Sequence, residues 1–343
     1  MIKQERLIIP DLLKGFAVIF MVQVHIFELF AQQEILEGFI GKFSLFLGSV
    51  PAAPVFMLVM GYFLAFRKKG LNQMIFRGIK LFCAGLVLNV LLNLNLAFHV
   101  FYEGWNEFIN IYHYWFGVDI LHLAGLSLIL IGLLQYVLGD KPLPWIILSL
   151  LIPAIGLMVD PFASENVFLN HVFAFIHGPQ EWSYFPLIPW FAYPLVGYAF
   201  RLIEKQKSDI WKEINIKYFL GVGLLIAIVI TSSWALKVAT NLPDYYHHGI
   251  RFFLWAVGLS ALWVIFISVF PKLKINKIVQ GYICWLGENV TLVYIIQWII
   301  IGNIATSIFK TQTLLQSIIW FIAIMIVTSL LTWLIRKRIT FRI

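Results

Sequence analysis

The sequence predicts an all-α fold: a polytopic integral membrane bundle of about ten transmembrane helices, forming a single domain over residues 1–343. Three observations predict it. The composition is 61% hydrophobic and 12% charged, apolar runs recur along the chain, and the basic residues gather in alternate connections. Soluble domains carry roughly 45–50% apolar and about 25% charged residues. A chain this apolar requires lipid around it, where each helix satisfies its own backbone hydrogen bonds.

Each predicted span is an apolar run that can cross the hydrocarbon, which takes about 20 residues at 1.5 Å rise per residue. In chain order the runs cover residues 12–30, 49–66, 78–97, 118–138, 144–160, 184–203, 216–236, 252–270, 282–303 and 313–335. The first run continues to Phe30 with no small-residue cleavage site after it. It is therefore predicted to be a helix of the bundle and not a signal peptide.

Lysine and arginine residues predict the orientation of the helices. All but four of the 25 fall at the two termini or in alternate connections, which the positive-inside rule assigns to the cytoplasm. The exceptions are Lys42, Lys237, Arg251 and Lys310. Both termini are thus predicted inside, and the bacterial inner (plasma) membrane is the expected location. The net charge of +8 is explained by this orientation, so no nucleic-acid partner is expected.

The first helix, IIPDLLKGFAVIFMVQVHIFELF, carries ionisable residues near both ends. Lys14 and His25 are eleven residues apart, so they project from one face, roughly 16 Å apart along the axis. This spacing suits a ligand with an anionic head and a long thin arm, and coenzyme A has that shape. Glu28, three residues after His25, could fix the tautomer of the imidazole. Ionisable groups inside spans are rare and usually functional.

A second histidine and carboxylate pair, Asp119 and His122, has the same spacing at the outer end of the fourth span. Polar residues near helix ends also snorkel toward the interface, so a structural role stays open for Glu28 and His122. Arg77 and Lys80 could hold phosphate groups or serve only the orientation of the helices. No HxxxH or HxH spacing occurs, so no metal is expected.

Five segments carry a resemblance to a known family. They are DLLKGFAVIFMVQVH, PVFMLVMGYFLAFR, FGVDILHLAGLSLIL, FPLIPWFAYPLVGYAFR and LGENVTLVYIIQW, in chain order. Together they resemble the transmembrane acyltransferases related to heparan-alpha-glucosaminide N-acetyltransferase, and the first is similar to the Arg-x10-His pattern of acyltransferase family 3. Lys14 stands where these families usually have arginine, and His25 stands at the family 3 catalytic histidine. Gln297 stands where relatives often have histidine.

The resemblance implies transfer of an acyl group, expected to be acetyl, from cytoplasmic acyl-CoA to a sugar hydroxyl or amine at the outer side. Within it, His25 or His122 would be the general base, and Glu28 and Asp119 would orient the imidazoles. The donor's phosphates would be bound by Lys14, Arg77 and Lys80, and the acceptor by Trp190, Asn289 and Tyr294. The expected partners are the lipid bilayer and a carbohydrate or glycan acceptor, with room for a homo-oligomer.

Two other functions fit the same residues. A transporter or flippase for a glycan or small anion would use a polar cavity between the helices for passage without acyl transfer. A haem-binding redox protein would use histidines from different helices as axial ligands.

Overall fold

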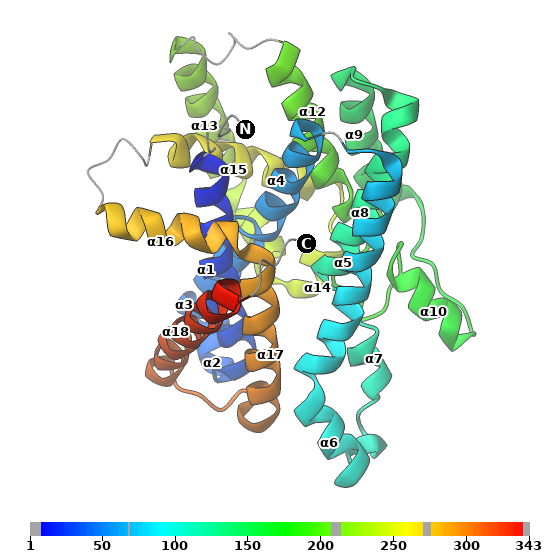
Figure 1. Ribbon diagram of the computed structural model, residues 1–343, viewed down its shortest axis with the longest axis vertical. Helices are drawn as coiled ribbons and strands as arrows, with labels where there is room; N and C mark the ends of the chain where they lie inside the picture. Colours follow the sequence, from blue (N-terminus) through cyan, green and yellow to red (C-terminus); the bar gives the residue numbers. More distant parts are fainter. Residues whose placement is uncertain (1–7, 68, 207–213, 270–275, 339–343) are drawn as a thin grey trace. The chain divides into compact units, whose positions relative to one another are not determined.

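The computed structural model describes residues 8–67, 69–206, 214–269 and 276–338, and helices make up most of this part of the chain (Figure 1). Within it, pairing of the β type is limited to one isolated bridge between Ala31 and Gln312. The predicted all-α membrane bundle is therefore confirmed. Some basic residues used to predict the orientation lie outside the described residues: Lys3, Arg6, Lys68, Lys207, Lys212, Lys272, Lys274 and Arg342.

Eight helical segments of the described chain are long and apolar enough to cross a membrane. They are Ile8–Phe30, Phe39–Phe66, Leu71–Leu92, Ile120–Leu138, Gly221–Thr240, Ile250–Val269, Val290–Ile308 and Leu314–Arg338. Each overlaps one of the ten predicted spans. The other two predicted spans are helical but shorter, because α9 (Pro142–Met158) has 17 residues and α12 (Ala192–Gln206) has 15.

Prolines and side-chain hydrogen bonds explain where the predicted boundaries were wrong. Pro186 and Pro189 restrict the chain before α12, so only the short α11 (Leu187–Trp190) precedes it. The predicted span 282–303 is two helices, α16 (Lys277–Glu288) and α17 (Val290–Ile308). Between them the Asn289 side chain donates to the Trp285 carbonyl over 2.8 Å, a local bond that competes with helix continuation.

The chain forms two compact units. The first comprises Met1–Phe56 and Gly258–Arg342, and the second is essentially Met57–Val257. In the first unit lie α1 (Ile8–Phe30), α2 (Gln33–Glu37), α3 (Phe39–Ser49), α16, α17 and α18 (Leu314–Arg338). In the second unit lie α5 (Leu71–Leu92), α6 (Leu94–Tyr102), a 3-10 turn (Trp105–Glu107), α7 (Ile111–Trp115), α8 (Ile120–Leu138), α9, α10 (Val167–Ala174), α11, α12, α13 (Ile214–Thr240) and α14 (Leu242–Tyr246). Two helices are divided between the units, α4 (Ala53–Phe66) and α15 (Ile250–Val269).

Helix α1 is the centre of the first unit and packs against α3, α16, α17 and α18. Its crossing with α16 is very close because glycine stands on both sides of it. A Cβ placed on Gly15 would lie 2.0 Å from the Ile283 carbonyl oxygen, and one on Gly287 would lie 2.0 Å from the Asp11 carbonyl oxygen. The position of α1 is therefore set by backbone contact with α16.

In the second unit, α5 and α8 pack together through a similar pair of glycines. A Cβ on Gly78 would lie 2.6 Å from the Gly125 carbonyl oxygen, and the reverse contact is equally short. A separate core forms around α9 and α12, where the rings of Trp145 and Tyr198 stack with centroids 4.0 Å apart. These contacts fix α8, the helix that carries His122.

Candidate functional site

Lys14 and His25 lie on one unbroken helix, α1, so the rise of roughly 16 Å between them follows from the helix geometry. The Lys14 ammonium pairs with the Asp11 carboxylate one turn earlier, at 3.0 Å. Asp11 is buried. A phosphate bound by Lys14 would share the ammonium with this carboxylate, which also holds the lysine side chain in place.

His25 and Glu28 face each other near the other end of α1. Nδ1 of His25 lies 3.9 Å from Oε2 of Glu28, an ion-pair distance too long for a direct hydrogen bond. The imidazole packs on Trp298 of α17 with ring centroids 4.0 Å apart. Tyr294, a predicted acceptor-binding residue, meets the same indole edge to face at 6.5 Å. The first unit thus brings His25 and Tyr294 against one tryptophan, with Glu28 beside the imidazole.

Gln297, beside Trp298 on α17, is a buried amide that the sequence marked only as a departure from a family pattern. Its side chain is 1% exposed, and neither its oxygen nor its nitrogen has a hydrogen-bond partner among the described residues. Buried polar groups are normally hydrogen-bonded. Asn289, by contrast, bonds the Trp285 carbonyl, and its amide serves the break between α16 and α17.

Asp119 and His122 form a reciprocal cap at the start of α8. The Asp119 carboxylate accepts from the backbone N–H groups of Ile120 and His122, and the Asp119 backbone N–H donates to Nδ1 of His122 over 3.0 Å. Asp119 therefore orients His122 through its backbone amide and not through the predicted carboxylate contact. Because Nδ1 accepts this bond, the proton of the neutral imidazole lies on Nε2.

Apolar groups enclose His122, which is fully buried. Phe82 and Phe175 present their rings edge to face at 5.0 and 5.4 Å. A Cβ on Gly85 would lie 2.8 Å from Nε2. Nε2 has no hydrogen-bond partner among the described residues. The surroundings of His122 are those of a core residue that caps a helix.

Basic side chains gather where α4 meets α5 in the second unit. Burial lowers the pKa of Lys69, and the positive charges of Arg77 and Arg67 lower it further. Lys80 is exposed and lies 4.5 Å above the Phe76 ring. Grouped cations of this kind attract polyphosphate ligands. Arg67 and Lys69 thus join the predicted Arg77 and Lys80 as candidates.

Trp190, predicted from the sequence to bind the acceptor, lies in a cluster of aromatic rings. The ring is fully buried, and its N–H donates to the Tyr246 carbonyl over 2.8 Å. It packs among aromatic rings, including Tyr193 at 5.3 Å and His248 at 5.2 Å. His248 is itself held at both nitrogens, by the Tyr193 hydroxyl at 2.8 Å and the Tyr245 carbonyl at 2.6 Å. The PLIPW segment therefore anchors the loop before α15.

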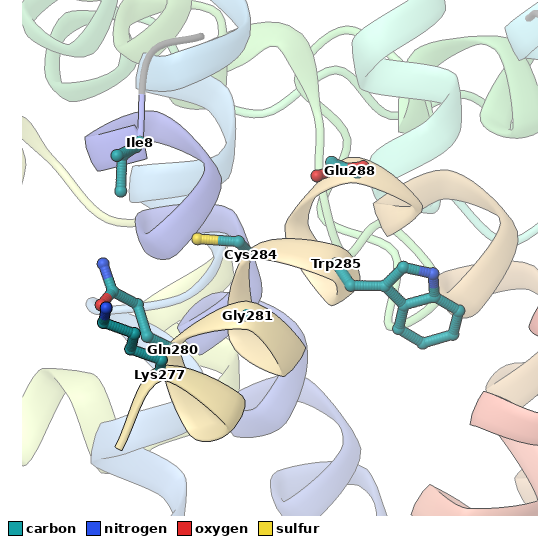
Figure 2. Close-up of a pocket in the computed structure, with 7 residues that line it drawn as sticks. All are labelled: Ile8, Lys277, Gln280, Gly281, Cys284, Trp285 and Glu288. Carbon is teal, nitrogen blue, oxygen red and sulfur yellow. The ribbon is translucent and has the colours of Figure 1, made fainter. Parts of the chain in front are cut away.

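An open cleft of about 560 Å³ lies in the first unit along α16 (Figure 2). Its lining residues are Ile8, Lys277, Gln280, Gly281, Cys284, Trp285 and Glu288. Lys277 and Gln280 lie side by side, whereas the Trp285 ring extends from the other side of the helix (Figure 2). No motif or spacing in the sequence predicted this cleft. Among the described residues, no three His, Cys, Asp or Glu side chains are grouped as metal ligands.

Comparison with known proteins gives a family match. A family model described as heparan-alpha-glucosaminide N-acetyltransferase, catalytic, matches residues 6–238, which is more than half of the chain. No curated protein matches the chain, and neither does any solved structure. The match covers α1 with Lys14 and His25 as well as α8 with His122.

Proposed function

Because the chain belongs to the heparan-alpha-glucosaminide N-acetyltransferase catalytic family and is thus a multi-pass membrane acetyltransferase, we propose that it moves an acetyl group from cytoplasmic acetyl-CoA to a sugar hydroxyl or amine at the outer side. The bacterial inner membrane is the proposed location. The family match begins in the first unit and runs through most of the second.

The observation that carries this proposal is the placement of Lys14 and His25 along α1. One helix holds an anchored cation, Lys14, and roughly 16 Å further along an imidazole, His25, that faces the Glu28 carboxylate. A thioester carrier has its charged groups at one end and its reactive carbonyl at the other, so it matches a helix that separates cation and base in this way. The cations around Arg77 are further candidates for the donor's phosphates.

His25 is the proposed general base. Since Nδ1 faces Glu28, a proton on Nδ1 leaves Nε2 with its lone pair free for the acceptor. Nε2 takes the proton from the acceptor's hydroxyl or amine as its oxygen or nitrogen attacks the thioester carbonyl. The C–S bond then breaks, coenzyme A leaves as the thiolate, and the proton on His25 can return to the sulfur. Such proton transfer contributes about 10²- to 10⁴-fold in rate.

His122 is the weaker candidate for the base. Its Nδ1 is occupied by the Asp119 amide, and its Nε2 carries the proton, so neither nitrogen is ready to accept one. Full burial against Phe82 and Phe175 also keeps the acceptor away from the imidazole. We therefore assign His122 a structural role. Tyr294 and Asn289 remain proposed acceptor contacts, and Trp190 does not.

The proposal is tested in proteoliposomes with [¹⁴C]acetyl-CoA in one compartment and glucosamine, as probe acceptor, in the other. We expect labelled acetylglucosamine on the acceptor side, with the transfer lost in His25→Ala. His99→Ala is the matched control, because His99 pairs with Glu103 at 2.6 Å in a histidine and carboxylate pair outside the site. Glucosamine that crosses the bilayer unacetylated and without donor would instead identify a transporter.

A further inference from the structure

One turn in the middle of α17 carries buried polar groups that the protein itself leaves unbonded. Gln297 is 1% exposed, and both its amide oxygen and its amide nitrogen lack a hydrogen-bond partner within the described ranges. The ring N–H of Trp298 is also buried and unpartnered in this part of the chain. Burying such groups unbonded costs their full desolvation, so they are rare in native proteins outside functional sites. This turn therefore offers hydrogen-bonding groups to a bound molecule.

The turn lies against the proposed base, within the first unit. Trp298 packs on the His25 imidazole of α1 with ring centroids 4.0 Å apart, and Tyr294 meets the same indole edge to face. Gln297 adjoins Trp298 in the chain and follows Tyr294 by three residues, a spacing that puts the two Cβ atoms about 5–6 Å apart. The Gln297 amide thus lies within one helical turn of the ring that covers the base.

The hydrogen-bonding capacity of the Gln297 amide indicates which chemical group it would bind. Its –NH₂ group only donates, and its carbonyl oxygen only accepts. A hydroxyl group both donates and accepts, whereas the carbonyl of a thioester only accepts. Of the two substrates in the proposed reaction, the sugar acceptor carries hydroxyl groups beside the reacting atom, and the reacting end of the donor is a carbonyl. The amide therefore matches the acceptor.

We propose that Gln297 binds the sugar acceptor, with its amide nitrogen donating to, and its amide oxygen accepting from, hydroxyl groups beside the atom that attacks the thioester. The inference rests on the proposed function, in which His25 is the base. Such a contact gives specificity, because a substrate without the hydroxyl leaves the buried amide unpaired. Gln297 lies outside the residues matched by the family model, so the match assigns it no role.

A simpler explanation is that Gln297 only fills the protein interior and bonds a structural water. Gln297→Met separates the two explanations, because methionine keeps the volume of the side chain and removes the amide. An amide that serves the acceptor stabilises nothing in the free protein, so its loss leaves Tm unchanged or higher and weakens acceptor binding. An amide that holds a structural water contributes to the fold, so its loss lowers Tm and leaves acceptor binding as it was.

Gln23→Met is the matched control, because Gln23 is a glutamine of α1 whose amide is bonded within the first unit. Its nitrogen donates to the carbonyls of Phe20 and Ser44 over 3.0 and 2.9 Å, and its oxygen accepts from the Ser44 hydroxyl over 2.7 Å. Gln23→Met should therefore lower Tm and leave the KM for glucosamine unchanged.

The experiment compares the parent, Gln297→Met and Gln23→Met by Tm in detergent, with and without glucosamine, and by KM for acetyl transfer in proteoliposomes. Glucosamine should raise the Tm of the parent, since a ligand that binds only the folded state stabilises it. We expect Gln297→Met to lose this rise, to increase the KM for glucosamine about tenfold and to keep the KM for acetyl-CoA.

An unchanged KM for glucosamine in Gln297→Met, or a glucosamine-induced rise in Tm as large as the parent's, would overturn the proposal. So would a Tm as low as that of Gln23→Met, because the amide would then be bonded within the folded protein. If the parent shows no acetyl transfer, the proposed function fails, while the glucosamine-induced rise in Tm still tests the Gln297 contact. The absence of that rise in the parent also overturns the contact.

Discussion

Replacing Gly287 with alanine is expected to force α1 and α16 apart and to displace the helix that carries Lys14 and His25. A Cβ at this position would lie 2.0 Å from the Asp11 carbonyl oxygen, 2.9 Å from its carbon and 3.0 Å from the Gly15 nitrogen. All three are backbone atoms, so no side-chain rotation can relieve the contact.

The size of the displacement follows from these distances. A carbon and a carbonyl oxygen in close contact are about 3.3 Å apart, so the two backbones must separate by about 1.3 Å. Overpacking of this kind costs about 1–3 kcal/mol. A misplacement of about 1 Å at a catalytic group can also cost about 10²-fold in rate. Gly287→Ala should therefore lower both Tm and acetyl transfer.

Gly281→Ala is the matched control on the same helix. A Cβ there meets nothing within 4 Å, and alanine inside a helix is favoured over glycine by about 0.5–1 kcal/mol. Both variants are compared with the parent protein in detergent by thermal unfolding, and in proteoliposomes by acetyl transfer. If Gly287→Ala unfolds at the temperature of Gly281→Ala and retains full activity, the close backbone crossing is refuted.

Three further predictions concern the second unit. Gly85→Ala should lower Tm, because its Cβ would lie 2.8 to 3.0 Å from three atoms of the buried His122 ring; an unchanged Tm would argue against that enclosure. Trp190→Phe leaves the Tyr246 carbonyl without its donor at a cost of about 1–3 kcal/mol, so Tm should fall while the KM for glucosamine stays constant. A raised KM with an unchanged Tm would instead support a sugar-binding role for Trp190. Burial lowers the pKa of His248 to about 4, whereas an unfolded histidine titrates near 6.5. The free energy of unfolding should therefore fall by on the order of 3 kcal/mol as pH falls from about 6.5 to 4. In His248→Asn the fall of Tm across that window should be smaller, and a slope equal to the parent's would contradict the buried neutral imidazole.

The fold class could be predicted because lipid places a simple demand on sequence. An apolar run of sufficient length has few alternatives to a helix. Helix ends could not be predicted as well, because they depend on local competition. Because of Pro186 and Pro189, α12 begins later than predicted, and the Asn289 amide lies at the break between α16 and α17. In the sequence, both segments are continuous apolar runs.

The candidate site could be predicted in part, because spacing on a helix fixes which side chains can meet. It places Glu28 within reach of His25, and Asp119 within reach of His122. Spacing does not say which atom makes the contact, so the backbone amide of Asp119 was not anticipated. Nor does residue type show whether an aromatic side chain is buried in the core or lines a binding pocket, and the fully buried Trp190 is an example.

We propose that His25, and not His122, accepts the proton during acetyl transfer. The most direct measurement compares kcat for His25→Ala with kcat for His122→Gln, because glutamine at this capping position can still accept the Asp119 N–H bond. We expect a loss of about 10²- to 10⁴-fold for His25→Ala and nearly full activity for His122→Gln. Full activity in His25→Ala together with a comparable loss in His122→Gln would contradict it.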